Sequence, residues 1–180
     1  MLTTVQRCLF ALFALLLAAG VQAASRAEID AKADEALQTL YRQSPAAQEL
    51  SQQAAGMLIF PEVYKAGIGI GGEYGEGALR IGGRSVDYYS TASASIGFQL
   101  GAQIKSQVIL FMTHDALARF RRSDGWEAGV DGSVAIATIG AGGTLDSNTL
   151  QSPIIGFIFS NKGLMYNLTL EGSKFTRLNK

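Results

Sequence analysis

The stretch from Phe60 to Gly77, FPEVYKAGIGIGGEYGEG, limits the folds open to this chain more than any other segment. Glycine this frequent cannot propagate a helix. In a strand it marks a bulge, a bend or the close approach of another backbone. We therefore predict a β-segment that a second backbone or a ligand approaches closely. The residues of this glycine-rich motif are Gly67, Gly69, Gly71, Gly72, Glu73, Tyr74, Gly75, Glu76 and Gly77.

The same stretch contains a formal GxGxxG pattern from Gly67 to Gly72, and Asp87 follows where a ribose-binding acid would be expected. A dinucleotide site needs a strand before the glycines and a helix opening from them. The following residues, 73–77, have glycine at every second position and cannot form that helix. The pattern therefore predicts a β-segment and not a nucleotide site.

Four blocks of the sequence resemble the SYLF domain, and they occur in the order found in that family. The resemblance implies a non-enzymatic domain that binds lipid, either phospholipid head groups or acyl chains. In eukaryotic members an N-terminal amphipathic segment is implicated in membrane binding, and fungal relatives bind and bundle actin. The blocks are MLIFPEVYKAGIGIGGEYGEG (57–77), SIGFQLGAQ (95–103), VILFM (108–112) and GLMYNLTLEG (163–172).

Residues 1–23 have the pattern of a secretory signal peptide. Arg7 precedes an apolar run from Leu9 to Ala19, and Val21-Gln22-Ala23 gives a cleavage site after Ala23. The run is shorter than the roughly 20 residues that span a bilayer. The only cysteine, Cys8, lies before the run, whereas a lipoprotein signal needs one after it. We expect a periplasmic or secreted protein with one domain, residues 24–180, and a departure from the lipoprotein pattern of many bacterial SYLF proteins.

Charge and cysteine content exclude two classes of protein. Cleavage after Ala23 would leave 14 basic residues (15 minus Arg7) against 15 acidic ones. This balance argues against a nucleic-acid-binding protein, which usually has a strong basic excess. The mature chain would also lack cysteine, so its stability must come from an ordinary core and not from disulfides.

Two N-terminal helices are expected. Ser25 and Glu28 form a capping-box pattern, and apolar residues recur at helical spacing from Ile29 to Tyr41. Ser44-Pro45 begins a second helix. The apolar faces can pack on a sheet, as most amphipathic helices do, or insert into a bilayer surface. The polar face mixes acidic and basic residues, which favours packing on the sheet.

The remainder of the chain is predicted to be mostly strand. A strand is expected over 57–60, and Pro61 favours either its end or a position at a sheet edge. Residues 78–81 and 85–90 should form a hairpin around Gly82-Gly83-Arg84. Lys105-Ser106 reads as a turn between two strands, 93–104 and 107–112. Further strands are expected over 134–139, 154–159, 164–170 and 175–178, and Thr113 should cap a helix over 114–121.

We find no pattern for catalysis or for a metal site. His114, the single histidine, falls in the first turn of an expected surface helix. No GxSxG, HExxH, CxxC or calcium-loop spacing is present. Glu73 and Glu76, three apart on a strand, should point to opposite faces. We therefore expect no enzyme, no cofactor and no metal.

The sequence thus predicts an α+β fold, with N-terminal helices packed on a twisted, mainly antiparallel sheet that is either open or closed as a barrel. By the SYLF resemblance the function is non-enzymatic binding of a phospholipid or a phosphoinositide-like lipid in the cell envelope. The alternative is a structural or protein-interaction module, with actin binding as a remote option. A basic and aromatic rim would contact the membrane, because cations attract anionic head groups and tyrosine suits the interface. Its predicted members are Tyr64, Lys65, Arg80, Arg84 and Lys105.

Overall fold

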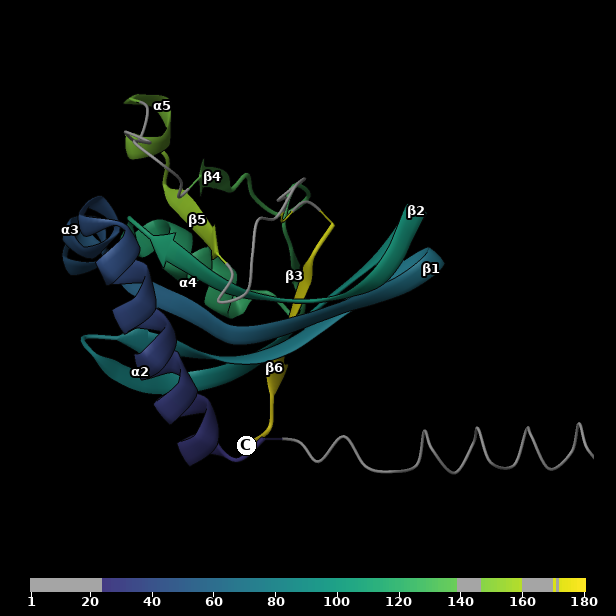
Figure 1. The fold of residues 1–180 in the computed structure, drawn as a ribbon. Coiled ribbons are helices and arrows are strands. Elements are labelled where there is room, and N and C mark those ends of the chain that lie inside the picture. Colours follow the sequence, from purple (N-terminus) through teal and green to yellow (C-terminus); the bar gives the residue numbers. More distant parts are fainter. Residues whose placement is uncertain (1–23, 139–146, 160–169, 171) are drawn as a thin grey trace, which may run out of the picture.

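One long pair of antiparallel strands dominates the fold (Figure 1). The structure, a computed structural model, describes residues 24–138, 147–159, 170 and 172–180, with side chains for all of these except 67–70, 95–102 and 138. The expected signal peptide and the expected strand over 164–170, apart from residue 170, lie outside the described residues. The elements are α2 (Arg26–Gln43), α3 (Pro45–Gln53), β1 (Gly56–Ile81), β2 (Arg84–Phe111), α4 (His114–Arg122), β3 (Trp126–Glu127), β4 (Ala135–Thr138), α5 (Ser147–Leu150), β5 (Ile154–Phe159) and β6 (Lys174–Leu178).

The hairpin between β1 and β2 turns at Gly82 and Gly83, whose φ angles are 59° and 78°. A two-residue turn with both φ angles positive matches the right-handed twist of the strands it joins. The predicted hairpin is therefore confirmed. The strand does not end at Pro61 but continues, with a register shift between Phe60 and Val63 at the proline. Among the named strands β1 pairs with β2 alone, so the alternative of an edge position agrees with the structure.

The predicted turn at Lys105-Ser106 is wrong. Lys105 pairs with Val63 of β1, and Ser106 pairs with Phe159 of β5, so β2 runs through both positions. The polar side chains suggested a surface turn. Within the fold their polar groups find partners: the Lys105 ammonium pairs with Glu73, and the Ser106 hydroxyl donates to the Pro61 carbonyl.

The β1–β2 ribbon doubles back on itself. A Cβ built on Gly75 would lie 2.6 Å from the carbonyl oxygen of Glu62, and one on Gly77 would lie 2.6 Å from Cδ1 of Phe60. These contacts place the second half of β1 directly against its own first half. The predicted close approach at the glycine-rich segment is confirmed, and the second backbone belongs to the same strand.

The six described strands form one curled sheet that makes a half-barrel. Its order is β3-β6-β2-β5-β4, with β1 paired to β2. Among the pairs of named strands, β4 and β5 run parallel and the other four pairs are antiparallel. The predicted α+β class with a mainly antiparallel sheet is confirmed.

Two main clusters of buried side chains lie on opposite faces of the sheet. Inside the curl, Phe120 of α4 packs with Trp126 and Phe175 at ring-centroid distances of 5.7 and 6.4 Å. On the outer face, α2 and α3 bury an apolar stripe that includes Leu40 and Ala47. The expectation that these helices pack on the sheet is confirmed (Figure 1).

Candidate functional site

A cavity of about 490 Å³ lies between the first turns of α2 and the doubled strand β1. Its walls combine apolar groups, two tyrosines and charged side chains. Pockets that hold small ligands usually measure roughly 300–1,000 Å³ and are lined in this mixed way. We call it the tyrosine pocket, lined by Ala24, Glu28, Ile29, Lys32, Pro61, Glu62, Tyr64, Tyr74, Gly75 and Glu76.

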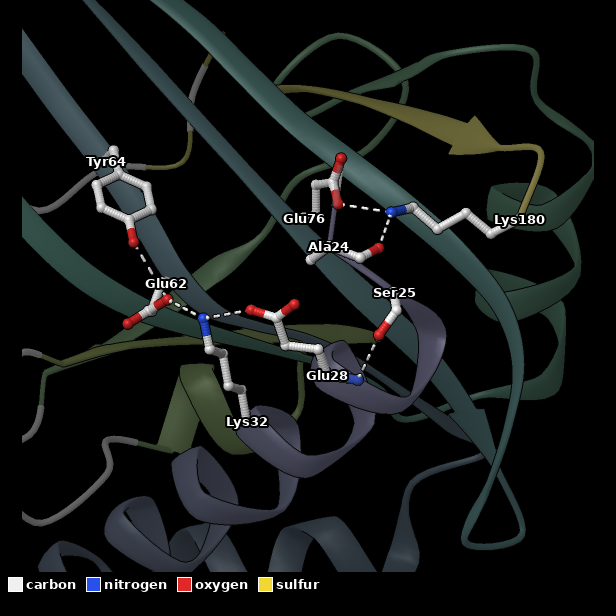
Figure 2. Close-up of polar contacts among 8 residues, drawn as sticks. All are labelled: Ala24, Ser25, Glu28, Lys32, Glu62, Tyr64, Glu76 and Lys180. Atoms are coloured by element: carbon white, nitrogen blue, oxygen red, sulfur yellow. Dashed lines mark hydrogen bonds and ion pairs between the residues drawn. The ribbon is translucent and has the colours of Figure 1, made fainter. Parts of the chain in front are cut away.

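The cap of α2 positions one wall of the pocket. The Ser25 hydroxyl accepts a hydrogen bond from the Glu28 amide at 3.2 Å, as the capping pattern predicted. Helical spacing then places Lys32 one turn after Glu28, and their side chains pair at 3.0 Å. The same Lys32 ammonium lies 2.9 Å from Glu62 of β1, so it joins the helix to the strand (Figure 2).

Each half of β1 contributes a tyrosine paired with a glutamate two residues away. The Tyr64 hydroxyl donates to Glu62 at 3.2 Å, and the Tyr74 hydroxyl donates to Glu76 at 3.0 Å. Residues two apart on a strand share a face, which explains why each pair meets.

The surroundings of Tyr64, Tyr74 and Lys32 raise the pKa values of all three side chains. Burial, reinforced by the neighbouring carboxylate, raises the pKa of Tyr64 and of Tyr74 above the ordinary value of 10.0. Hydrogen bonds to Glu62 and then Glu28 raise the pKa of Lys32. At neutral pH both phenols therefore keep their protons and Lys32 keeps its charge.

Lys180 binds two of the residues that line the pocket. Its ammonium pairs with Glu76 at 2.7 Å, and each of the two side chains is only 12% exposed. The same ammonium donates to the carbonyl oxygen of Ala24 (Figure 2). Lys180 thus connects Ala24, at the other end of the described chain, with Glu76 of the glycine-rich motif.

A second polar cluster lies inside the curl of the sheet. Glu73 pairs with Lys105 at 2.5 Å and with Lys65 at 3.2 Å. The Lys105 side chain is 4% exposed, and this burial lowers its pKa, against the opposing effect of Glu73. Gln107, two residues further along β2, is fully buried, and its amide has no hydrogen-bond partner among the described residues.

The structure separates the five residues predicted to form a basic and aromatic rim. Tyr64 is 52% exposed and lines the tyrosine pocket, whereas Lys65 and Lys105 share Glu73. Arg80 is buried, and it pairs with Asp34 of α2 at 2.6 Å. Arg84 is exposed at the end of the hairpin turn. The fold therefore does not bring the four cations together as one exposed rim.

The glycine-rich motif divides between the two polar clusters. Tyr74, Gly75 and Glu76 line the tyrosine pocket, and Glu73 faces the other way to meet the two lysines. The prediction that Glu73 and Glu76 point to opposite faces agrees with these separate partners. Gly77 supports the doubled strand, and the backbone of Gly67, Gly69, Gly71 and Gly72 runs within β1.

Six lining residues were not among the predicted site residues, and three of them are charged: Glu28, Lys32 and Glu62. Lys180, which pairs with the lining residue Glu76, was not predicted either. The spacing of Glu28 and Lys32 was visible as a helical ion pair. Nothing in the sequence pointed to Lys180, because its contact with Glu76 depends on the path of the whole chain.

The last turn of α4 carries three arginines, Arg119, Arg121 and Arg122. Arg119 pairs with Asp115 at 2.8 Å, and Arg121 pairs with Asp87 at 3.1 Å. Two of its three arginines thus have acidic partners, in addition to the favourable position of cations at a helix C-terminus.

The described residues offer neither a metal site nor a membrane-spanning helix. Within the ranges given above, no group of three or more His, Cys, Asp or Glu residues is arranged to hold a metal ion. No described helix is both long enough and apolar enough to cross a bilayer.

Comparison with known proteins gives one family match. Residues 92–180 match the family model Ysc84, described as Las17-binding protein actin regulator. No curated protein matches the chain. The match begins within β2 and includes α4 and all later elements. All the residues that line the tyrosine pocket lie between Ala24 and Glu76, and they therefore precede the matched segment.

Proposed function

We propose, from the premise that this chain belongs to the SYLF (Ysc84) family through residues 92–180, that it is a lipid-binding domain of the cell envelope. The family is one of binding domains and not of enzymes. The specific ligand proposed is a phospholipid. Its polar head would occupy the tyrosine pocket, and the adjoining apolar surface would contact the upper part of the acyl chains.

The observation that carries this proposal is the mixed character of the tyrosine pocket. Ile29, Pro61 and Gly75 supply apolar wall, and charged groups lie across the same cavity. Tyr64 and Tyr74 are 52% and 43% exposed. Exposed tyrosine with a polar tip and an apolar ring suits the boundary between head groups and hydrocarbon. A phospholipid likewise has a polar head group directly next to its apolar acyl chains.

Liposome flotation of residues 24–180 tests the proposal. We expect the protein to float with phospholipid vesicles, and Tyr64→Ala to reduce the bound fraction several-fold. Val130→Ala is the matched control, since Val130 is 74% exposed but lies outside the pocket. Absence of flotation with every vesicle composition, or equal loss in both variants, would remove the proposal.

The predicted basic rim needs a different test because Arg80 and Lys105 are buried. Reversing their charge would break the ion pairs with Asp34 and Glu73, so reduced binding would also report misfolding. Arg84→Glu is informative, since Arg84 is exposed. Reduced binding to anionic vesicles at low salt, with unchanged folding, would support a role for Arg84. Normal binding would exclude it.

A protein partner is the second candidate, and the description of the matched family as a Las17-binding actin regulator favours it. Actin co-sedimentation is a direct test. Export makes contact with actin depend on delivery into a host cytoplasm. Concentration-dependent oligomers that ignore lipid would favour a structural role in the envelope.

The proposed location rests on the sequence of residues 1–23. A basic n-region, an apolar run and Val21-Gln22-Ala23 support export and cleavage near Ala23. The mass of the protein recovered from a cell fraction outside the cytoplasm would test this directly, because cleavage after Ala23 fixes the expected mature chain at residues 24–180.

A further inference from the structure

We infer that the tyrosine pocket recognises a positively charged nitrogen, the ammonium of an amine-bearing phospholipid head group, in preference to a net-anionic head group. The inference rests on the proposed lipid-binding function and specifies the ligand of that same pocket. The relevant groups are three carboxylates, two lysines and two tyrosines.

The charge balance of the pocket suits a zwitterion better than a net anion. Glu28, Glu62 and Glu76 line it, against Lys32 in the lining and Lys180 at its side. Cleavage after Ala23 would add the α-ammonium of Ala24, which lines the same cavity, so that three carboxylates would face three cationic groups. This balance leaves no excess positive charge to attract a net-anionic lipid, whereas a zwitterion preserves it and can place its ammonium at a carboxylate.

The two lysines are already engaged by protein groups. Lys32 lies between Glu28 and Glu62 at 3.0 and 2.9 Å (Figure 2). Lys180 donates to Glu76 and to the Ala24 carbonyl. A phosphate that used either lysine would have to displace a carboxylate, so the pocket has no ready site for a second anion.

The carboxylates, in contrast, retain acceptor capacity. Glu62 receives Lys32 and Tyr64 through Oε2 alone, and Glu28 meets Lys32 through Oε1. Among the described residues the second oxygen of each carboxylate accepts no hydrogen bond. These side chains are also 37% and 50% exposed, so an incoming N–H group or methylated ammonium can reach them.

The tyrosine rings add a second attraction for a cation. Ammonium groups bind the faces of aromatic rings, and quaternary ammonium ligands are often held by several such rings. Tyr64 and Tyr74 come from the two halves of the doubled strand, and both line this cavity. Each hydroxyl is held by its own glutamate, at 3.2 and 3.0 Å, which fixes the rings at the pocket.

Flotation of the purified mature chain, residues 24–180, with two kinds of vesicle tests the inference. Phosphatidylcholine vesicles carry a quaternary ammonium, and phosphatidylglycerol vesicles carry the same phosphate without nitrogen. We expect at least about three-fold more protein bound to phosphatidylcholine at moderate salt. We expect Glu62→Gln to abolish that preference without loss of binding to phosphatidylglycerol.

Glu49→Gln is the matched control, because it removes the same charge from an exposed position on α3 outside the pocket. Trp126 emission confirms that each variant is folded, since this single tryptophan is buried. Stronger binding to phosphatidylglycerol, or equal effects of Glu62→Gln and Glu49→Gln, would overturn the inference. No flotation with either vesicle would overturn the proposed function itself.

Soluble competitors distinguish a lipid from a free amine as the source of the ammonium. Glycerophosphocholine and ethanolamine are added to the phosphatidylcholine arm, with glycerol phosphate as the nitrogen-free control. Release by glycerophosphocholine alone assigns a lipid head group. Release by ethanolamine as well supports ammonium recognition that needs no lipid backbone. Release by glycerol phosphate alone would contradict the inference, because the phosphate would then be the recognised group.

Discussion

Replacing Gly77 by alanine tests whether the doubled strand holds the fold together. A Cβ at this position would lie 2.6 Å from Cδ1 of Phe60 and 2.9 Å from the carbonyl carbon of Ile59, whereas ordinary contacts begin at 3.4 Å. The Phe60 ring is fully buried, and the Ile59 carbonyl belongs to the backbone. The two halves of β1 must therefore separate by about half an ångström or more.

This separation should be costly because both halves contribute to the same core. Overpacking of a tight core typically costs 1–3 kcal/mol, and we expect Gly77→Ala to lower the free energy of unfolding by about 3 kcal/mol. That is a large share of the roughly 5–15 kcal/mol typical of a domain. Urea unfolding followed by Trp126 emission measures it, with an unchanged slope against denaturant confirming that the midpoint reports stability.

Gly72→Ala provides the matched comparison within the same strand. A Cβ there would lie 3.7 Å from the Ser93 carbonyl oxygen, an ordinary contact. Both variants lose the same glycine flexibility in the unfolded chain, so their difference isolates the clash. We expect Gly72→Ala to change stability by less than about 1 kcal/mol. Equal unfolding midpoints for the two variants would refute the argument that the halves of β1 are in close contact.

Three further perturbations have expected outcomes. Gln107→Leu should raise the free energy of unfolding by about 1 kcal/mol, measured by urea unfolding, because it removes a buried amide with no partner among the described residues; a loss of stability would mean that the amide is satisfied. Glu73→Gln should lower it by roughly 3 kcal/mol, because Lys105 would be left buried without its countercharge; restoration by the double variant with Lys105→Met would confirm the cause. Burial, with the nearby Asp30 carboxylate second, raises the pKa of Tyr88 above 10.0. Since the unfolded chain then loses this proton first, stability should be complete below pH 10 and fall as pH rises above it. Tyr88→Phe should reduce that alkaline fall in thermal unfolding measured across pH, and an unchanged slope would contradict this account.

Local patterns predicted much of the fold. Ser25 and Ser44 mark the starts of the two helices, and both cap the helices as expected. Gly82 and Gly83 form the predicted hairpin turn because only a few residue types adopt two successive positive φ angles. These features depend on neighbours within four residues, which is the range over which sequence patterns carry information.

The errors come from contacts that are distant in sequence. Lys105 looked like a turn residue because an exposed lysine is the usual case. Its place in a buried strand depends on Glu73, which reaches it only because β1 doubles back. The separation of Arg80 from the other predicted rim residues likewise depends on Asp34 of α2. Residue type alone could not decide which cations remain exposed.

The doubled ribbon also has a consequence for the order of folding. Pairing of β1 with β2 can begin at Gly82-Gly83 and extend one pair at a time, so each step closes only a short loop. The contact of Gly77 with Ile59 does not form during this stepwise pairing of β1 with β2, because both residues belong to β1. We expect a transition state with the hairpin paired and the ribbon still open. Changes at the Gly82-Gly83 turn should then slow folding, and changes at Gly77 should mainly speed unfolding.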